Sequence, residues 1–210
     1  MDICYIFGGG ERSECNITFN PGDLVIAADA GFDYLKDLGL RADVVLGDFD
    51  SVMSYDLPSD CLRYPREKDD TDMMLAAKLG LEKGYREFRI YGGLGGRLDH
   101  TLGNIQVLTY LADHDASGIL WANDHAIEVV KDGTISFSKD LAENRPDNII
   151  SIFSLSEVSV DVTIKGLKYE VENVNLTHDF PLGISNEFTG NKAYVNVKKG
   201  TIAVLWYLID

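Results

Sequence analysis

Gly47-Asp48-Phe49-Asp50-Ser51 follows directly on the apolar run Val44-Val45-Leu46. The run predicts a buried strand, and the acidic stretch marks its polar end. Side chains of an extended chain alternate between faces, so Asp48 and Asp50 are expected to project the same way. Two adjacent carboxylates repel each other unless a cation lies between them, and Mg²⁺ favours such hard oxygen ligands. A solvated turn capped by Asp and Ser is the alternative for this stretch alone.

Similar junctions of apolar runs with polar residues recur through the first 122 residues. Apolar runs predict strands at 3–7, 24–28, 44–46, 61–64, 87–91 and 119–122, and helical spacing predicts helices at 32–38, 71–83 and 98–111. Continuously apolar strands that alternate with helices are typical of an open, mainly parallel α/β sheet, here Rossmann-like. Ligands bind beyond the carboxyl ends of strands in such sheets, and the acidic residues of this half fall there.

The pattern changes after residue 122. Short β-rich runs follow at 127–130, 134–138, 149–154, 158–164, 193–197 and 202–208, with no long helical pattern among them. This pattern is typical of an antiparallel sandwich or barrel, with the polar stretch 141–148 as a loop inside it. We therefore place an α/β domain at residues 1–124 and an antiparallel β domain at residues 125–210.

Composition and charge exclude several functional classes. The chain has 210 residues and a formal charge of -15, without a Lys/Arg run, so we expect no nucleic-acid partner. Its three cysteines are scattered without zinc-ligand spacing. The acidic N-terminus does not resemble a signal peptide, and no apolar run reaches membrane length. We expect a protein of the reducing cytoplasm that does not bind membranes.

Lys68-Asp69-Asp70-Thr71-Asp72 lies at the predicted start of a helix. Asp and Thr are ordinary N-capping residues, and acidic side chains favour the positive end of the helix dipole. Capping explains Asp69 or Asp70 well. Asp72 lies inside the first turn, close to the expected ligand edge of the sheet, and is harder to explain in this way.

Gly92-Gly93-Leu94-Gly95-Gly96-Arg97-Leu98-Asp99-His100 joins a predicted strand to a predicted helix. Four glycines allow close approach of the backbone to a bound group, and helix-start N–H groups favour anions. Arg97 adds a bidentate phosphate fork and Asp99 a further carboxylate. A flexible turn with a terminal ion pair is the alternative. The chain contains neither the standard phosphate-binding P-loop nor a G-x-S-x-G nucleophile elbow.

These motifs, taken in order with three others, resemble the thiamine pyrophosphokinase family. The three others are Asp29-Ala30-Gly31, Gly166-Leu167-Lys168-Tyr169 and Gly183-Ile184-Ser185-Asn186-Glu187-Phe188. The resemblance covers nearly the whole chain. It implies an α/β domain that holds ATP and Mg²⁺, a C-terminal β-sandwich that helps to hold thiamine, and a homodimer. It also implies one-step transfer of the terminal pyrophosphoryl group of ATP to the thiamine hydroxyl, with release of AMP.

The resemblance further implies roles for single residues. Asp48, Asp50 and Asp72 are the expected metal ligands. Candidate catalytic residues are Asp48, Asp50, Asp72, Arg97 and Asp99, and candidate substrate-binding residues are Asp29, Lys68, Asp69, Arg97, Tyr169, Ser185 and Asn186. Lys68 and Arg97 correspond to phosphate contacts, and Ser185 and Asn186 to thiamine-side groups. Tyr169 lies where family members often carry an aromatic residue, frequently Trp.

Two alternatives to this activity stay open at this point. A pyrophosphokinase for another hydroxymethyl heterocycle, such as a pterin, would share the acidic clusters but would not need residues 185–187. A non-catalytic sensor of nucleotide or thiamine leaves the many candidate metal-binding carboxylates unexplained. For the homodimer, we expect each site to join the α/β domain of one chain to the β domain of its partner.

Overall fold

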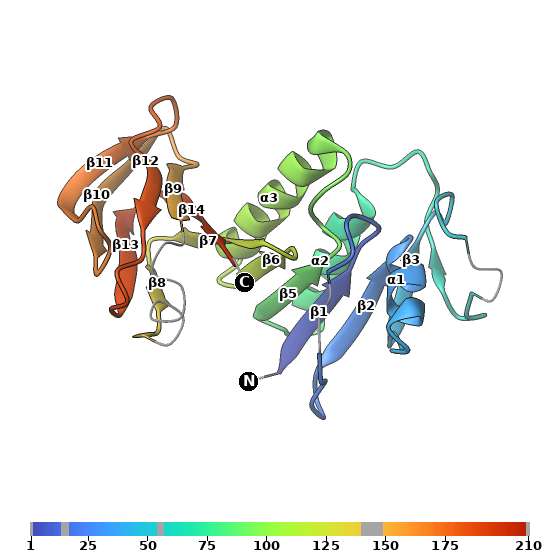
Figure 1. The fold of residues 1–210 in the computed structure, drawn as a ribbon. Helices are drawn as coiled ribbons and strands as arrows, with labels where there is room; N and C mark the ends of the chain where they lie inside the picture. Colours follow the sequence, from blue (N-terminus) through green and yellow to red (C-terminus); the bar gives the residue numbers. More distant parts are fainter. Residues whose placement is uncertain (1, 14–16, 54–56, 140–148, 209–210) are drawn as a thin grey trace. The chain divides into compact units, whose positions relative to one another are not determined.

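The computed structural model describes residues 2–13, 17–53, 57–139 and 149–208. The chain divides into two compact units, Met1–Asn123 and Asp124–Asp210 (Figure 1). The loop expected at 141–148 lies outside the described residues.

The first unit contains a parallel sheet with three helices. Its strands run in the order β6-β5-β1-β2-β3-β4, and every adjacent pair is parallel. They are β1 (Ile3–Phe7), β2 (Leu24–Ala28), β3 (Val44–Gly47), β4 (Leu62–Arg63), β5 (Glu87–Tyr91) and β6 (Ser117–Trp121), and the helices are α1 (Gly31–Asp37), α2 (Asp72–Glu82) and α3 (Leu98–Asp113). The predicted α/β sheet is confirmed. The Rossmann-like description fits loosely, because the described residues between β1 and β2 contain no helix.

Both faces of this sheet are covered, because its central strands are apolar throughout. Tyr5 and Phe7 of β1 belong to a buried cluster with Tyr34 of α1, and the Phe7 and Tyr34 ring centroids are 5.3 Å apart. The alternate residue Cys4 lies on the other face beside Gly80 of α2. Burial of each large apolar side chain contributes about 1.5–3 kcal/mol.

The helices begin and end at recognisable signals. Thr71 caps α2, because its side-chain oxygen accepts a hydrogen bond from the Met74 N–H at 3.2 Å. Gly84 follows the end of α2 with a φ of 94°. No helix among the described residues is both long enough and apolar enough to cross a membrane.

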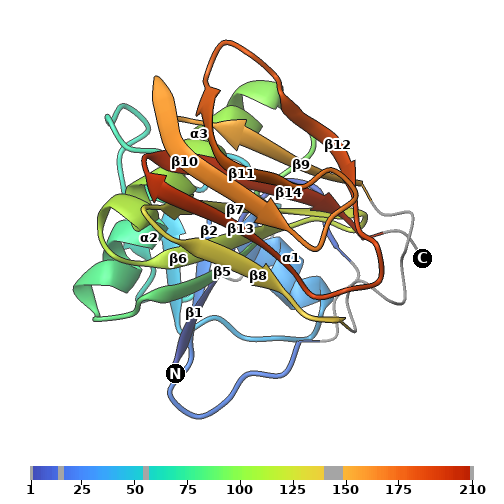
Figure 2. The same cartoon turned by 90° about the vertical axis from the view of Figure 1, so that its left-hand side faces the viewer.

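The second unit is a sandwich of two antiparallel sheets, which lie one behind the other in Figure 2. One has the order β12-β9-β14-β7 and the other β11-β10-β13-β8. The strands are β7 (His125–Lys131), β8 (Thr134–Phe137), β9 (Ile149–Ser154), β10 (Val158–Lys165), β11 (Val171–Thr177), β12 (Gly183–Glu187), β13 (Ala193–Lys199) and β14 (Thr201–Tyr207). Phe137 and Trp206 join the two sheets with ring centroids 5.4 Å apart. The predicted β-sandwich is confirmed, but β11 and β12 were not predicted.

Two glycines of the first unit yield a matched prediction. A Cβ on Gly31 would lie 1.8 Å from the Phe7 carbonyl oxygen, whereas a Cβ on Gly103 in α3 would meet no atom of the described residues within 4 Å. Gly31→Ala should therefore destabilise the fold by about 1–3 kcal/mol through a forced backbone shift. Gly103→Ala should stabilise it by about 0.5–1 kcal/mol through helix propensity. Urea unfolding followed by circular dichroism measures both. A Gly31→Ala variant as stable as the parent protein would contradict the close approach of α1 to β1.

Candidate active site

A cleft of about 720 Å³ lies at the carboxyl ends of the strands in the first unit. After β1 the chain builds β2, β3 and β4 on one side, and β5 and β6 lie on the other side. The strand order therefore reverses between β1 and β5, and open α/β sheets bind ligands at that point. Gly8–Gly10 after β1 and the glycines after β5 line the cleft.

Two glycine-rich loops form one wall of this cleft. The Gly10 N–H donates to the Gly92 carbonyl oxygen at 2.7 Å, and a Cβ on Gly10 would lie 2.6 Å from the Leu94 carbonyl oxygen. Gly92 has a φ of 63°, which glycine adopts readily. The two loops can touch only because glycine has no side chain. For the same reason, their backbone stays open to a bound phosphate.

Three carboxylates converge beside these loops. One oxygen from each of Asp29, Asp48 and Asp50 lies within 4.8 Å of the others. The expectation of an extended Asp48–Asp50 segment is wrong. Phe49 has a φ of 62°, and the Asp50 N–H donates to Asp48 Oδ1 at 3.1 Å, which are features of a tight turn. The turn, rather than strand alternation, brings the two carboxylates together.

Asp29 is held against the end of β3. Its N–H donates to the Leu46 carbonyl oxygen at 2.8 Å, and a Cβ on Gly47 would lie 3.1 Å from the Asp29 Cα. Burial, followed by the charges of Asp72 and Asp48, raises the pKa of Asp29. Asp29 Oδ1 is buried, and no group among the described residues donates a hydrogen bond to it. A buried carboxylate oxygen without a donor, beside two further carboxylates, fits a divalent cation.

Lys68 connects the turn to the start of α2. Its ammonium lies 3.2 Å from Asp72 Oδ1 and 3.8 Å from Asp48 Oδ2. Burial raises the pKa of Asp72, although Lys68 partly offsets the effect. Asp72 is therefore linked to the carboxylate group through Lys68, although its oxygens lie outside the tight set of three.

Arg97 and Asp99 form an exposed pair that lines the cleft. Arg97 Nη2 donates to Asp99 Oδ2 at 2.6 Å, and Arg97 Nε donates to Asp99 Oδ1 at 3.1 Å. The Arg97 guanidinium lowers the pKa of Asp99 to about 2. The planar fork thus already grips a carboxylate, a geometry that also suits phosphate.

Asp69 and Asp70 separate in the structure. Asp69 is exposed and lines the cleft. Asp70 pairs with Lys78 at 2.7 Å, so its role at the start of α2 is an ion pair rather than a cap.

Three features of the cleft were not predicted from the sequence. Gly8–Gly10 line it, and their place after an apolar strand was a usable signal. Arg66 lies 3.4 Å from Asp50. Asn104 is a polar residue in the buried stripe of α3, and its Nδ2 donates to the Gly93 carbonyl oxygen at 2.6 Å. A polar side chain at a core position of a helix was the available signal for Asn104.

The thiamine-side candidates belong to the second unit. The Tyr169 N–H donates to Asn186 Oδ1 at 2.9 Å, and the Ser185 N–H donates to Ser151 Oγ at 3.1 Å. Tyr169 is 58% exposed, whereas Asn186 is buried. The structure thus brings Tyr169 and Asn186 together.

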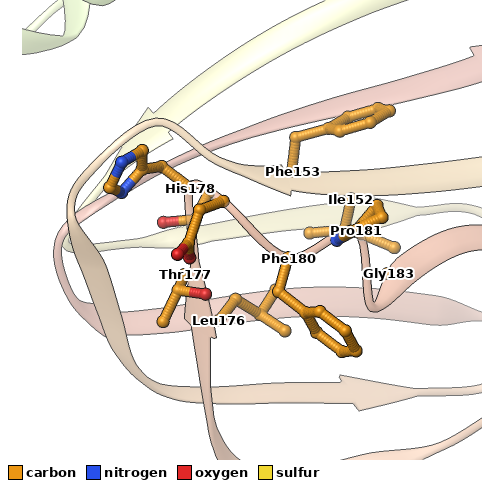
Figure 3. A pocket seen from close by; sticks show the side chains of 10 residues that line it. Ile152, Phe153, Leu176, Thr177, His178, Phe180, Pro181 and Gly183 are labelled. Carbon is orange, nitrogen blue, oxygen red and sulfur yellow. The ribbon is translucent and has the colours of Figure 1, made fainter.

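A second hollow lies in the second unit, between β9 and the segment that joins β11 to β12 (Figure 3). Its volume is about 120 Å³. Pockets for drug-sized ligands measure roughly 300–1,000 Å³, so the cleft of the first unit is the better candidate for a nucleotide site.

Comparisons with known proteins agree with this geometry. Residues 16–120 match the model of the thiamin pyrophosphokinase catalytic domain, and residues 128–202 match that of the thiamin pyrophosphokinase vitamin B1 binding domain. A thiamine pyrophosphokinase from Bacillus subtilis is 32% identical over 188 residues, which are 87% of this chain and 86% of that protein. A thiamin pyrophosphokinase from Caenorhabditis elegans is 24% identical over 76% of this chain and 68% of its own length.

Solved structures give the same result. The crystal structure of a Bacillus subtilis thiamine pyrophosphokinase has a TM-score of 0.87 and 27% identity, with all of both chains covered. That of a Geobacillus thermodenitrificans thiamin pyrophosphokinase has a TM-score of 0.81 and 26% identity, over 99% of this chain and 98% of that one. Together with the fold and the acidic cleft, these matches show that the chain belongs to the thiamine pyrophosphokinase family.

Proposed function

We propose that this chain transfers the pyrophosphoryl group of ATP to the hydroxyl of thiamine in a Mg²⁺-dependent reaction that yields thiamine diphosphate and AMP. The observation that carries the proposal is the convergence of Asp29, Asp48 and Asp50 within 4.8 Å at the edge of a glycine-lined cleft. We infer the substrates, ATP and thiamine, from membership of the family.

Asp29, Asp48 and Asp50 would hold the metal, and Asp72 completes the acidic wall. The bound ion would neutralise charge on the phosphoryl oxygens of ATP. The chain itself supplies Lys68, whose ammonium lies 3.2 Å from Asp72, as a positive group for the transferring phosphoryl group. The N–H groups of the glycine loops orient the phosphates, and this positioning needs no covalent intermediate.

Arg97 is the second cationic contact for ATP. Its two hydrogen bonds to Asp99 hold the guanidinium plane on the cleft wall. A phosphate in the cleft would accept hydrogen bonds from the guanidinium N–H groups that do not bond Asp99, while Asp99 keeps the side chain at the rim.

We further propose that the second unit holds thiamine, with Tyr169 stacking on its cationic ring and Ser185 beside it. In a cytoplasmic homodimer, each site would combine the first unit of one chain with the second unit of its partner. The exposed apolar side chains of the second unit support an interface there: Phe153 on β9, Ile184 on β12, and Phe180 and Leu182 in the segment before β12.

A product assay tests this function. Purified protein is incubated with ATP, Mg²⁺ and thiamine, and AMP and thiamine diphosphate are quantified together. Equal amounts of both products support the proposal. Activity with a pterin alcohol in place of thiamine would favour the alternative pyrophosphokinase, and binding without AMP formation would favour a sensor.

Arg97→Lys tests the phosphate fork. An ammonium keeps the charge but cannot donate in two parallel directions, so kcat should fall about tenfold or more and the KM for ATP should rise. The KM for thiamine and the thermal stability should stay near those of the parent protein, because the Arg97–Asp99 pair is exposed. Unchanged kinetics would make Arg97 a surface ion-pair residue.

Mixed dimers test the composite site. Asp50→Asn damages the first unit and Tyr169→Ala the second, the latter assayed at low thiamine. Unfolding and refolding an equal mixture should make about half of the dimers mixed, each with one intact and one doubly damaged site. Activity should return to roughly a quarter of the parent value. If size exclusion and mass spectrometry confirm mixed dimers and activity does not return, each site lies within one chain.

A further inference from the structure

A β-bulge in β12 directs Asn186 into the protein. Gly183 pairs with Ile152 of β9 and Asn186 pairs with Ile150, so three steps along β12 match two steps along β9. The extra residue lies at 184–185, and Ser185 has a φ of 58°. A bulge of this kind resets which face the following side chains point to. Ile184 is therefore exposed, whereas Asn186 is only 5% exposed.

The Asn186 amide is engaged by main chain. Its Oδ1 accepts hydrogen bonds from the N–H groups of Tyr169 and Glu187, both at 2.9 Å. Its Nδ2 donates to the Tyr169 carbonyl oxygen at 2.8 Å. Rotation of the amide by 180° would place the NH₂ group against two N–H donors, so the network fixes its orientation. The side chain thus bonds both polar groups of the Tyr169 backbone, as a neighbouring strand would.

Residues on either side anchor the same segment. Leu167 and Phe188 form an isolated antiparallel bridge, and both are buried. The Lys168 N–H donates to the Glu187 carbonyl oxygen at 3.0 Å. Ladder pairing ends there, and the Asn186 side chain continues it by one residue to Tyr169.

From this arrangement we propose that Asn186 is a positioning residue, which fixes the backbone of Tyr169 so that its exposed ring is presented to thiamine. The inference rests on the proposed function, in which Tyr169 stacks on thiamine. It separates Asn186 from the thiamine-side groups that touch the substrate, because Asn186 is buried and its amide is committed to main chain.

A double-mutant cycle tests this role, with thiamine affinity measured by calorimetry and thiamine KM by the product assay. Tyr169→Ala and Asn186→Ala should each weaken thiamine about tenfold, with kcat and the KM for ATP little changed. The Tyr169→Ala/Asn186→Ala double variant should be no weaker than Tyr169→Ala alone, because no ring remains to be misplaced. If the losses of thiamine affinity in the two single variants multiply in the double variant, Asn186 contacts thiamine independently, and the proposal is overturned. No effect of Tyr169→Ala on thiamine would also overturn it.

Asn186→Asp serves if Asn186→Ala does not fold. It keeps the shape and the acceptor oxygen but loses the donor to the Tyr169 carbonyl, so thiamine affinity should fall and the double variant with Tyr169→Ala should again show no further loss. Asn196→Ala is the matched control. Asn196 Nδ2 donates to the Gly133 carbonyl oxygen and to Thr134 Oγ1, so it ties a different segment of the same unit. Its removal should leave thiamine affinity unchanged.

Amide hydrogen exchange in the absence of ligand tests the clamp, by which we mean the hydrogen bonds of the Asn186 side chain to the N–H and carbonyl groups of Tyr169. The Tyr169 amide should exchange slowly in the parent protein and in Asn196→Ala, and fast in Asn186→Ala. Fast exchange in the parent protein would overturn the clamp whatever the substrate is. A protected Tyr169 amide in a protein that neither binds nor converts thiamine would instead refute the proposed function and leave the clamp in place.

Discussion

Mutual repulsion of carboxylates at the ends of β2 and β3 is the constraint on which the first unit depends. Asp29, Asp48 and Asp50 approach within 4.8 Å, and burial raises the pKa of Asp29. The chain holds them there with unusual backbone: Asp29 and Phe49 have φ values of 50° and 62°. Such conformations cost on the order of 1 kcal/mol each or more and persist at functional sites where a ligand gains from them.

The rest of the unit makes this crowding tolerable. Gly47 has no side chain to separate β3 from Asp29, and Gly31 lets α1 begin against the end of β1. Lys68 lies between Asp48 and Asp72 and supplies one positive charge. Arg66 beside Asp50 supplies a second, so two cations face four carboxylates among the described residues and the site stays net negative. A divalent cation would complete the charge balance before a polyphosphate binds.

Secondary-structure elements, and the positions that follow from sheet geometry, could be predicted from the sequence. Apolar runs and helical spacing give most elements, and the parallel sheet places Asp29 and Asp48 at one edge. β11 was missed because only Leu176 of its seven residues is buried, so the strand carries no apolar pattern. β12 was missed because its bulge breaks the alternation.

Some side-chain pairs and turns could not be predicted from the sequence for a different reason. The pairing of Asp70 with Lys78 depends on distances that several arrangements of the same motif would change. The Arg97–Asp99 pair, by contrast, is the terminal ion pair that the sequence offered as the alternative for residues 92–100. The turn at Phe49 could not be predicted either, because glycine usually occupies a left-handed position and here the residue is phenylalanine. Asn186 was predicted as a site residue, but its hydrogen bonds to the Tyr169 backbone were not predicted.

Thermal unfolding of Asp29→Asn with and without Mg²⁺ tests the central claim most directly. Asparagine tolerates the left-handed conformation of Asp29 well, so the change removes charge with little strain. Because the pKa of Asp29 is raised in the fold, its carboxylate opposes folding increasingly as the pH rises above its unfolded value of about 3.8. The metal-free variant should therefore melt above the parent protein at pH 7, and this difference should vanish near pH 4. Mg²⁺ should stabilise the parent protein and have little effect on the variant. Equal stability without metal and an equal response to Mg²⁺ would contradict the account.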